Sequence, residues 1–287
     1  MAERWRLIRG TGRPAENMAR DAAMAWAVGE GLVPPTLRLY RWEPAAVSVG
    51  YAQRGDAALD LVACARAGLA VVRRPTGGKA VLHGRDLTYA VAVPRHGTWG
   101  KGNPAACCRR IHEAVAAGLN RLGAPAQVAG PRAPLGGAHE GSGVPCFAAL
   151  SSHEITVGGR KLVGSAQRRF VRAILQHGSI PLVAERGRLA ALVPGDSAHA
   201  LGLLEAAMVS LAEVLGGPPD PEVVAAALTE GFAAVLDVRF TEGAWDPAEE
   251  AIVAQLEAEG DGGGFREAVA ERSEGALTPS GPSASLT

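Results

Sequence analysis

The chain has 287 residues, of which 47% are hydrophobic, and its 29 basic side chains balance 29 acidic ones. This length accommodates one large domain with a small appendage, and the balanced charge excludes bulk electrostatic attraction to nucleic acid or an anionic membrane. No apolar run approaches the roughly 18–20 residues of a membrane span, and the N-terminus has no signal-peptide core. The four cysteines form no CxxC pair, so a zinc ribbon is not expected, and the dispersed histidines form no H-E-x-x-H pair that would indicate a catalytic metal. Free thiols suit a cytoplasmic location.

The first half of the chain alternates predicted helices with predicted strands. Helical periodicity is expected over residues 14–30, 56–67 and 103–122. Strand-like apolar or alternating runs cover residues 37–42, 46–49, 69–73, 80–82 and 87–93. A Gly- and Pro-rich loop then occupies residues 130–145, and loops of this length in a compact domain are usually functional or disordered.

The second half begins with a predicted β-hairpin, residues 154–157 and 161–163, which turns at Gly158-Gly159. A further strand is expected over residues 172–177. Helices are predicted at residues 198–215, 221–236 and 247–259, and they form a small helical C-terminal region. The final residues have few large apolar side chains and are predicted to be disordered.

The most informative segment is VVRRPTGGKAVLHGRDLTYA, residues 71–90, in which two strand-like runs flank a polar turn. Gly77 and Gly78 allow positive φ and close approach to a ligand, and the neighbouring arginines and lysine can hold a polar group. The segment is not a P-loop, because Arg73 replaces the leading glycine and Ala80 replaces the Ser or Thr that would hold magnesium. The alternative is a plain hairpin turn with solvated charges.

Two further positions carry candidate chemistry. Cys146 follows a proline at the exit of the long loop, and Lys161 comes fifteen residues later. A nearby ammonium raises the thiolate fraction of a cysteine at neutral pH, although an inert buried cysteine and a surface lysine fit the same positions. His177 and His83 either line a ligand pocket or are satisfied histidines at strand ends.

Six ordered segments across residues 14–182 carry a resemblance to a known family: PAENMARDAA, TLRLYRWEPAAVSVGYAQ, VRRPTGGKAVLHGRDLTYAV, PCF, GGRKLVGSAQRR and ILQHGSI. Together they resemble the lipoate/biotin protein ligase superfamily, and within it the octanoyltransferases of the Gram-positive type. In that subgroup the reactive cysteine lies shortly before the R-K-L/V-x-G-S-A motif, where this chain has Cys146. The chain departs from the ligases at Lys79, where they carry a third glycine, and at Gly84, where they often carry Asp.

The resemblance implies an α+β fold, with a mixed or antiparallel sheet core flanked by helices. It divides the chain into a catalytic domain at residues 1–216, a helical extension at 217–262 and a disordered tail at 263–287. It implies transfer of octanoate from octanoyl-acyl carrier protein to a lysine of a lipoyl-domain protein, the glycine-cleavage H protein first, by a monomer that needs neither cofactor nor metal.

The residues implied as catalytic are Cys146 and Lys161. Those implied to bind substrate are Arg73, Arg74, Thr76, Gly77, Gly78, His83, Gly164, Ser165, Ala166, His177 and Gly178. Two alternatives remain open at this point: an ATP-dependent lipoate–protein ligase, and a non-catalytic module that binds acyl or biotinyl groups.

Overall fold

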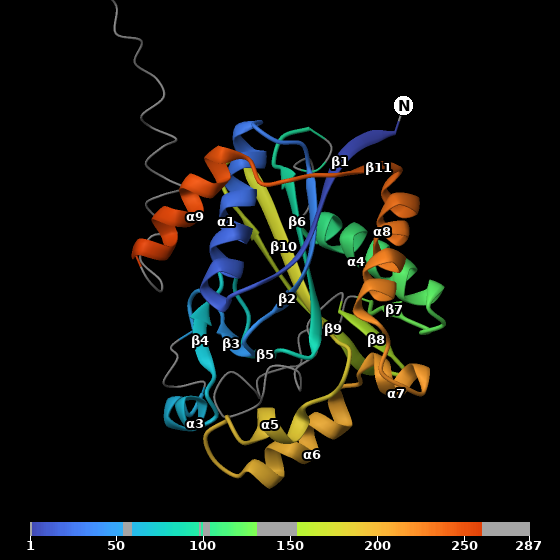
Figure 1. Cartoon of the computed structure of the whole chain (residues 1–287). Helices are drawn as coiled ribbons and strands as arrows, with labels where there is room; N and C mark the ends of the chain where they lie inside the picture. Colours follow the sequence, from blue (N-terminus) through green and yellow to red (C-terminus); the bar gives the residue numbers. More distant parts are fainter. Residues whose placement is uncertain (1, 54–58, 98, 100–103, 131–153, 260–287) are drawn as a thin grey trace, which may run out of the picture.

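A mixed eight-stranded sheet forms the centre of the computed structural model, which describes residues 2–53, 59–97, 99, 104–130 and 154–259 (Figure 1). Strand β1 pairs in parallel with both neighbours, whereas β6 pairs in antiparallel with β2 and β10. In spatial order the strands are β11 (Val238–Glu242), β1 (Glu3–Gly12), β2 (Thr36–Trp42), β6 (Asp86–Pro94), β10 (Ala173–Pro181), β9 (Arg160–Arg169), β8 (Ile155–Val157) and β7 (Gln127–Val128). The expected α+β fold is confirmed.

A second, three-stranded sheet carries the approach to the glycine turn. Its order is β4 (Ala70–Arg73), β3 (Ala46–Val49) and β5 (Val81–His83). Strand β3 pairs in parallel with β4 and in antiparallel with β5. Because residues 74–80 join β4 to β5, the turn is held at both ends by strands that share β3 as a neighbour.

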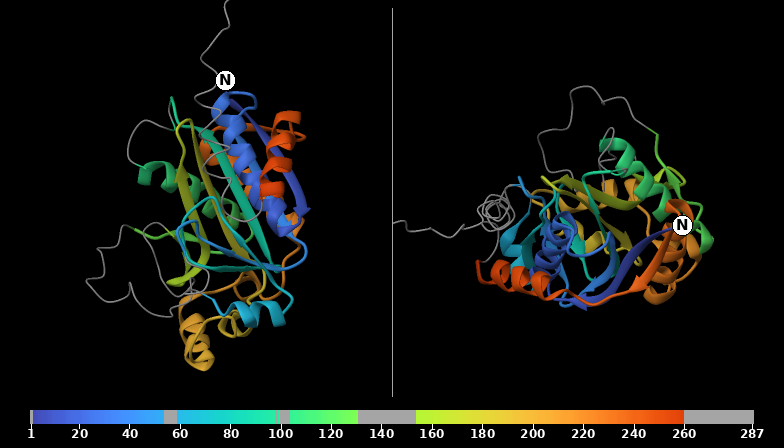
Figure 2. Two further views of the ribbon diagram at one scale, coloured as in Figure 1. Left: turned by 90° about the vertical axis from the view of Figure 1, so that its left-hand side faces the viewer. Right: turned by 90° about the horizontal axis from the view of Figure 1, so that it is seen from above.

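Long helices cover both faces of the large sheet (Figure 2). One face packs against α1 (Pro14–Glu30) and α9 (Pro247–Glu259), and the other packs against α4 (Pro104–Arg121) and α8 (Pro221–Leu236). Helix α1 begins at a proline, with Glu16 in its first turn, and ends at Gly31, whose φ of 74° is the left-handed conformation of a helix C-terminus. Two hydrophobic clusters result, one on each side of the sheet.

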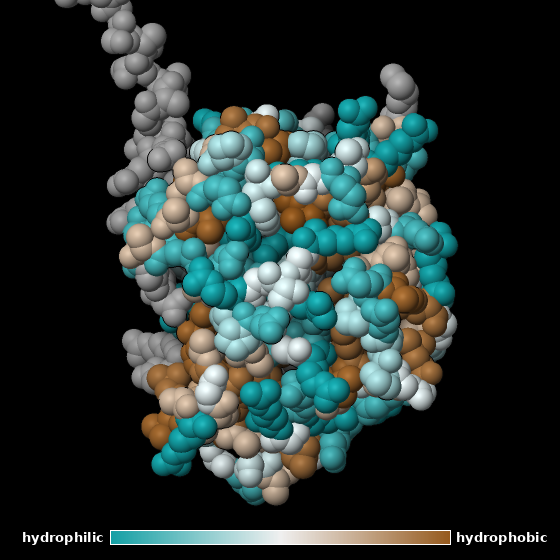
Figure 3. Space-filling model, in the orientation of Figure 1, coloured by the Kyte–Doolittle hydropathy of each residue, from teal (hydrophilic) through white to brown (hydrophobic). Residues whose placement is uncertain are grey.

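Shorter helices lie below the sheets in Figure 1. They are α3 (Leu61–Arg66), α5 (Arg186–Ala190), α6 (Ser197–Ala207) and α7 (Leu211–Leu215). On the face seen in Figure 3, hydrophilic and hydrophobic residues are interspersed. None of the helices in the described ranges is long and apolar enough to cross a membrane.

Several predicted elements need correction. The sequence patterns do not predict strands β1 and β11 or helix α5. The single helix expected at residues 198–215 is two helices, α6 and α7. It is interrupted because residues 208–210 pass beside β9, where Met208 forms a β-bridge with Lys161. Helix α3 is shorter than expected and starts at the N-cap Asp60, whose side chain accepts from the Ala63 amide. The predicted loop at 130–145 and the tail at 263–287 lie outside the described residues, except for Gly130.

The residues predicted as a C-terminal extension contact the rest of the fold closely. Helix α8 packs against α4, where Gly231 and Gly118 bring the two backbones together, and β11 completes the large sheet. A separable unit at residues 217–262 stays a prediction.

Candidate active site

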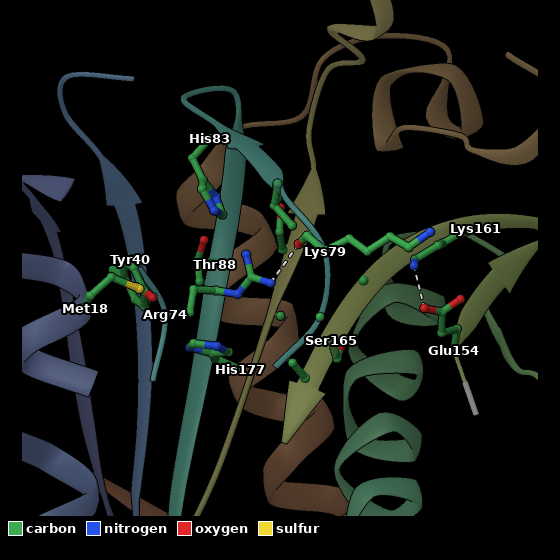
Figure 4. Close-up of a pocket in the computed structure, with 16 residues that line it drawn as sticks. Met18, Tyr40, Arg74, Lys79, His83, Thr88, Glu154, Lys161, Ser165 and His177 are labelled. Atoms are coloured by element: carbon green, nitrogen blue, oxygen red, sulfur yellow. Dashed lines mark hydrogen bonds and ion pairs between the residues drawn. The ribbon is translucent and has the colours of Figure 1, made fainter. Parts of the chain in front are cut away.

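A cavity of about 250 Å³ lies between the glycine turn, helix α1 and strands β6, β9 and β10. Figure 4 shows Met18 and Tyr40 toward one end of it and Lys161 with Glu154 toward the other. The residues that line it are Met18, Tyr40, Arg74, Gly78, Lys79, Val81, His83, Thr88, Glu154, Lys161, Gly164, Ser165, Ala166, His177, Gly178 and Ser179. The walls therefore come from both sheets and from α1.

The glycine turn is wrapped around the side chain of Arg74. The Arg74 Nη1 donates to the Ser48 carbonyl at 2.7 Å and to Ser48 Oγ at 2.8 Å. Its Nη2 donates to the carbonyls of Gly77 and Lys79 at 3.0 and 2.8 Å. A guanidinium presents donors in a fixed fork, so these four contacts set the path of the turn relative to β3.

Arg73 has a different environment from Arg74. Its Nη1 donates to the carbonyls of Gly50, Tyr51 and Gln53 at 3.0, 3.0 and 2.8 Å. These bonds hold the segment that follows β3. Arg73 thus binds the segment that follows β3 to the start of the turn, and it is not among the residues that line the cavity.

His177 belongs to a buried network that links α1, β10 and the turn. Its Nδ1 lies 2.8 Å from Asp21 Oδ2, and its Nε2 lies 2.5 Å from Thr76 Oγ1. Asp21 also accepts from Arg38 Nη1 at 2.7 Å and from the Tyr40 hydroxyl at 2.9 Å. Because an ionised carboxylate only accepts, the His177 Nδ1 carries the hydrogen, and Thr76 donates to Nε2 of the neutral ring.

Burial and charge set the ionisation of this network. Burial lowers the pKa of His177 despite the adjacent Asp21. Burial alone would raise the pKa of Asp21, but the His177 hydrogen bond and the Arg38 charge outweigh it, so the pKa of Asp21 is lowered. A neutral imidazole beside a charged carboxylate is the resulting state at neutral pH.

His83 forms a second network of the same form. Its Nδ1 lies 2.8 Å from Asp86 Oδ2, its Nε2 lies 2.7 Å from Ser48 Oγ, and its ring stacks on Trp42 with centroids 4.0 Å apart. Burial would raise the pKa of Asp86, but the contact with His83 and the hydrogen bonds from the Gly84 amide and the Ser179 hydroxyl lower it overall. Asp86, three residues after His83, is therefore the carboxylate that contacts this imidazole.

At the other end of the cavity, Lys161 and Glu154 form a buried ion pair. Lys161 Nζ lies 2.5 Å from Glu154 Oε1, and the two side chains are only 6% and 5% exposed. Lys161 is the second residue of β9, and Glu154 directly precedes β8, so the hairpin brings them together.

The middle of the cavity is lined by backbone of the sheet. Gly164, Ser165 and Ala166 of β9 lie opposite Ser179, Gly178 and His177 of β10. A Cβ on Gly178 would come within 2.6 Å of both Ser165 Oγ and Tyr89 Cε1, so no larger side chain fits there without displacing them.

The described cysteines lie away from the cavity. Cys64 packs in the core of the small sheet, and Cys107 and Cys108 lie on α4. Burial raises the pKa of all three thiols, that of Cys108 to about 11. Cys146 lies outside the described residues.

Most of the described residues implied by the resemblance meet at this cavity. Those that line it are Arg74, Gly78, His83, Lys161, Gly164, Ser165, Ala166, His177 and Gly178. Thr76 is fully buried behind His177, and Gly77 lies exposed on the turn. Val81 also lines the cavity, whereas Val163 packs into the hydrophobic core.

Sequence reasoning missed Met18, Tyr40, Thr88, Glu154 and Ser179. Of these five, only Glu154 could have been inferred from the sequence. It and Lys161 lie on either side of the Gly158-Gly159 turn, and a hairpin brings its two strands together.

The cavity, the buried Lys161–Glu154 pair and the glycine turn lie together on an α+β scaffold. The family described as the lipoyl protein ligase A/B catalytic domain matches residues 13–233, and the chain belongs to this family. The octanoyltransferase LipM of Kyrpidia tusciae is 41% identical over 264 residues, which cover 88% of this chain and 94% of the relative. That of Moorella thermoacetica is 39% identical over 262 residues, covering 90% and 95%. The chain is accordingly an octanoyltransferase, an acyltransferase of protein lipoylation.

Two solved structures of the same fold are described as lipoate protein ligases. A lipoate-protein ligase A bound with ATP superposes with a TM-score of 0.73 at 23% identity, over 90% of this chain and 95% of that one. A bipartite lipoate protein ligase from Thermoplasma acidophilum gives 0.69 at 21% identity, over 89% and 93%. At such identities these likenesses show the fold alone.

Proposed function

We propose that the chain takes octanoate from octanoyl-acyl carrier protein and transfers it to a lysine of a lipoyl-domain protein, with the glycine-cleavage H protein as first acceptor. Cys146 carries the octanoyl group between the two steps as a thioester. The observation that carries this proposal is the buried Lys161–Glu154 pair in the wall of a cavity shared with the glycine turn. The raised pKa of each described thiol supports Cys146 as the nucleophile among the four.

In the first step the Cys146 thiolate attacks the carbonyl carbon of the donor thioester. A new carbon–sulfur bond forms to Cys146, the bond to the phosphopantetheine sulfur breaks, and the released thiolate takes up a proton. The Lys161 ammonium stabilises negative charge that develops on the carbonyl oxygen or on the sulfur. Cys146 precedes Glu154, which lines the cavity, by eight residues. An extended chain of that length spans at most about 29 Å, so this is the upper limit on the distance between the two residues.

In the second step the neutral amine of the acceptor lysine attacks the octanoyl thioester. The amide bond forms, the bond to Cys146 breaks, and the proton lost by the amine neutralises the departing thiolate. Conversion of a thioester to an amide is downhill, so the reaction requires neither ATP nor a metal. Burial of the octanoyl chain against Met18 and Val81 contributes about 0.8 kcal/mol per methylene.

The direct test is to incubate the protein with octanoyl-acyl carrier protein and map the added mass. One octanoyl group is expected on Cys146, and Cys146→Ala is expected to abolish both the label and the transfer. Continued transfer by Cys146→Ala would overturn the thioester route. Lys161→Ala should slow acylation and shift the alkylation pH profile of Cys146 upward, because a nearby ammonium favours the thiolate.

A comparison of donors separates this function from the alternatives. An ATP-dependent lipoate ligase would use free lipoate with ATP and would not use octanoyl-carrier protein. A non-catalytic binding module would use neither donor, and its Cys146 would be unreactive in a thiol titration.

A further inference from the structure

The Lys161 ammonium, proposed above to stabilise negative charge in the reaction, is buried beside a carboxylate. Its side chain is 6% exposed and that of its partner Glu154 is 5% exposed, with 2.5 Å between Nζ and Oε1. A buried ammonium without a counter-charge is costly and tends to lose its proton. The Glu154 carboxylate supplies a counter-charge in direct contact with the Lys161 ammonium.

The backbone around this pair is held on both sides. Lys161 lies opposite Thr156 of β8 and forms a parallel bridge with Met208, and its carbonyl accepts from the Val209 amide at 2.9 Å. The Glu154 carbonyl accepts from the Ala129 amide at 2.8 Å. With both backbones fixed, the remaining freedom of the lysine lies in its four-carbon side chain, which the carboxylate restrains.

The pair lies at one end of the cavity and belongs to its wall. Figure 4 shows the Lys161–Glu154 contact at the end opposite Met18 and Tyr40, and the Lys79 side chain points from the turn toward this same end. The other titratable side chains that line the cavity are Tyr40, Arg74, Lys79, His83 and His177. Among the described residues that line the cavity, Glu154 carries the carboxylate, and it contacts the lysine at this end.

We propose that Glu154 is a positioning residue for acyl transfer: its carboxylate fixes the Lys161 ammonium in the cavity wall and keeps it charged. Lys161 then acts as a fixed positive charge beside the reacting carbonyl and not as the base that deprotonates the acceptor amine. This inference rests on the proposed function of the same site. Under this proposal, removal of the Glu154 carboxylate leaves the Lys161 side chain in the protein but without its charge or its position in the cavity wall.

The experiment compares Glu154→Gln, Lys161→Met and the double variant in octanoyl transfer from octanoyl-acyl carrier protein to an apo lipoyl-domain protein. Rates are measured from about pH 6 to about pH 9, because a side chain needed in its charged form shows itself as a limb of the pH profile. Glu154→Gln keeps a hydrogen-bond acceptor but removes the charge. Above neutral pH its kcat is expected to fall by about 100-fold, the scale of losing one oxyanion-stabilising donor, while the KM for the donor stays close to that of the wild type.

Two readouts distinguish positioning from a general structural role. The deficit of Glu154→Gln should shrink as the pH is lowered, because acid restores the proton of Lys161. The double variant should be no slower than Lys161→Met alone, because both changes remove the same interaction. A deficit that is equal at every pH, or losses that multiply in the double variant, would overturn the proposal.

The chain offers a matched control in Glu249, which forms a buried pair with Arg6 at 2.6 Å and lines no part of the cavity. Glu249→Gln should lower the unfolding temperature without changing the shape of the pH profile. If Glu154→Gln does not fold, Glu154→Asp, which keeps the charge but withdraws it by one methylene, should lower kcat and retain a wild-type pH profile. Failure of the wild-type protein to use octanoyl-carrier protein would overturn the proposed function, whereas normal wild-type transfer with an unaffected Glu154→Gln would overturn only this inference.

Discussion

Gly50 offers the sharpest test of how closely the glycine turn must be placed. A Cβ at Gly50 would lie 1.9 Å from the Gly78 carbonyl oxygen and 2.9 Å from the Gly78 carbonyl carbon. Ordinary contact begins near 3.4 Å, so Gly50→Ala would push the turn away by about 1.5 Å. The turn carries Arg74, Gly78 and Lys79, and the displacement therefore moves one wall of the cavity.

The expected loss of activity in Gly50→Ala follows from how steeply the reaction rate depends on the alignment of the reacting groups. A displacement of about 1 Å in a positioning element can cost about 100-fold in rate, so kcat/KM for Gly50→Ala should fall by at least that factor, or about 2.7 kcal/mol of transition-state stabilisation. Overpacking should also lower the free energy of unfolding by about 1–3 kcal/mol. Steady-state octanoyl transfer and urea denaturation measure the two effects.

Gly10→Ala is the matched control, because nothing lies within 4 Å of a Cβ at Gly10. It should leave both the transfer rate and the stability unchanged. A folded Gly50→Ala protein with the wild-type kcat/KM would show that the turn does not shape the reactive cavity.

Further predictions concern the buried charges and the thiols. Asp21→Asn should lower the free energy of unfolding by about 3–5 kcal/mol in urea denaturation, because it leaves Arg38, which is 4% exposed, without its counter-charge; a loss below about 1 kcal/mol would contradict this. The free energy of unfolding should fall as the pH drops below about 6.5, because the unfolded chain takes up a proton that His177, with its lowered pKa, does not take up when folded. In His177→Gln that part of the pH dependence should disappear, and its persistence would assign it to another group. Iodoacetamide at neutral pH should label Cys146 ahead of Cys108, whose pKa burial raises to about 11, and mass mapping that finds Cys108 labelled first would count against the proposed nucleophile.

The sequence could predict those parts of the site that depend on a few adjacent residues. The glycine turn between two apolar runs and the Gly158-Gly159 hairpin both lie within short windows, and Lys161 falls at a definite place in the second. Turn chemistry depends on a few adjacent residues, so such segments can be interpreted without the rest of the fold.

The partners of the site residues could not be predicted in this way. Asp21 reaches His177 from a helix that begins near the start of the chain, and Asp86 reaches His83 only because the chain turns at Gly84. These pairings depend on the register between β6, β10 and the helix above them, which periodicity does not specify. Strand β11 was missed for a related reason, since five residues between two helices form a strand here only because the edge of β1 is available.

The pairing of β1 with β11 also has a consequence for the order of folding during synthesis. Strand β1 ends at Gly12 and its outer neighbour starts only at Val238, so the ribosome makes β11 long after β1. Until β11 emerges, one edge of β1 presents unpaired amide and carbonyl groups to any other extended chain nearby. The nascent protein therefore carries an open sheet edge while the residues between the two strands are made, and an unpaired edge of this kind favours aggregation.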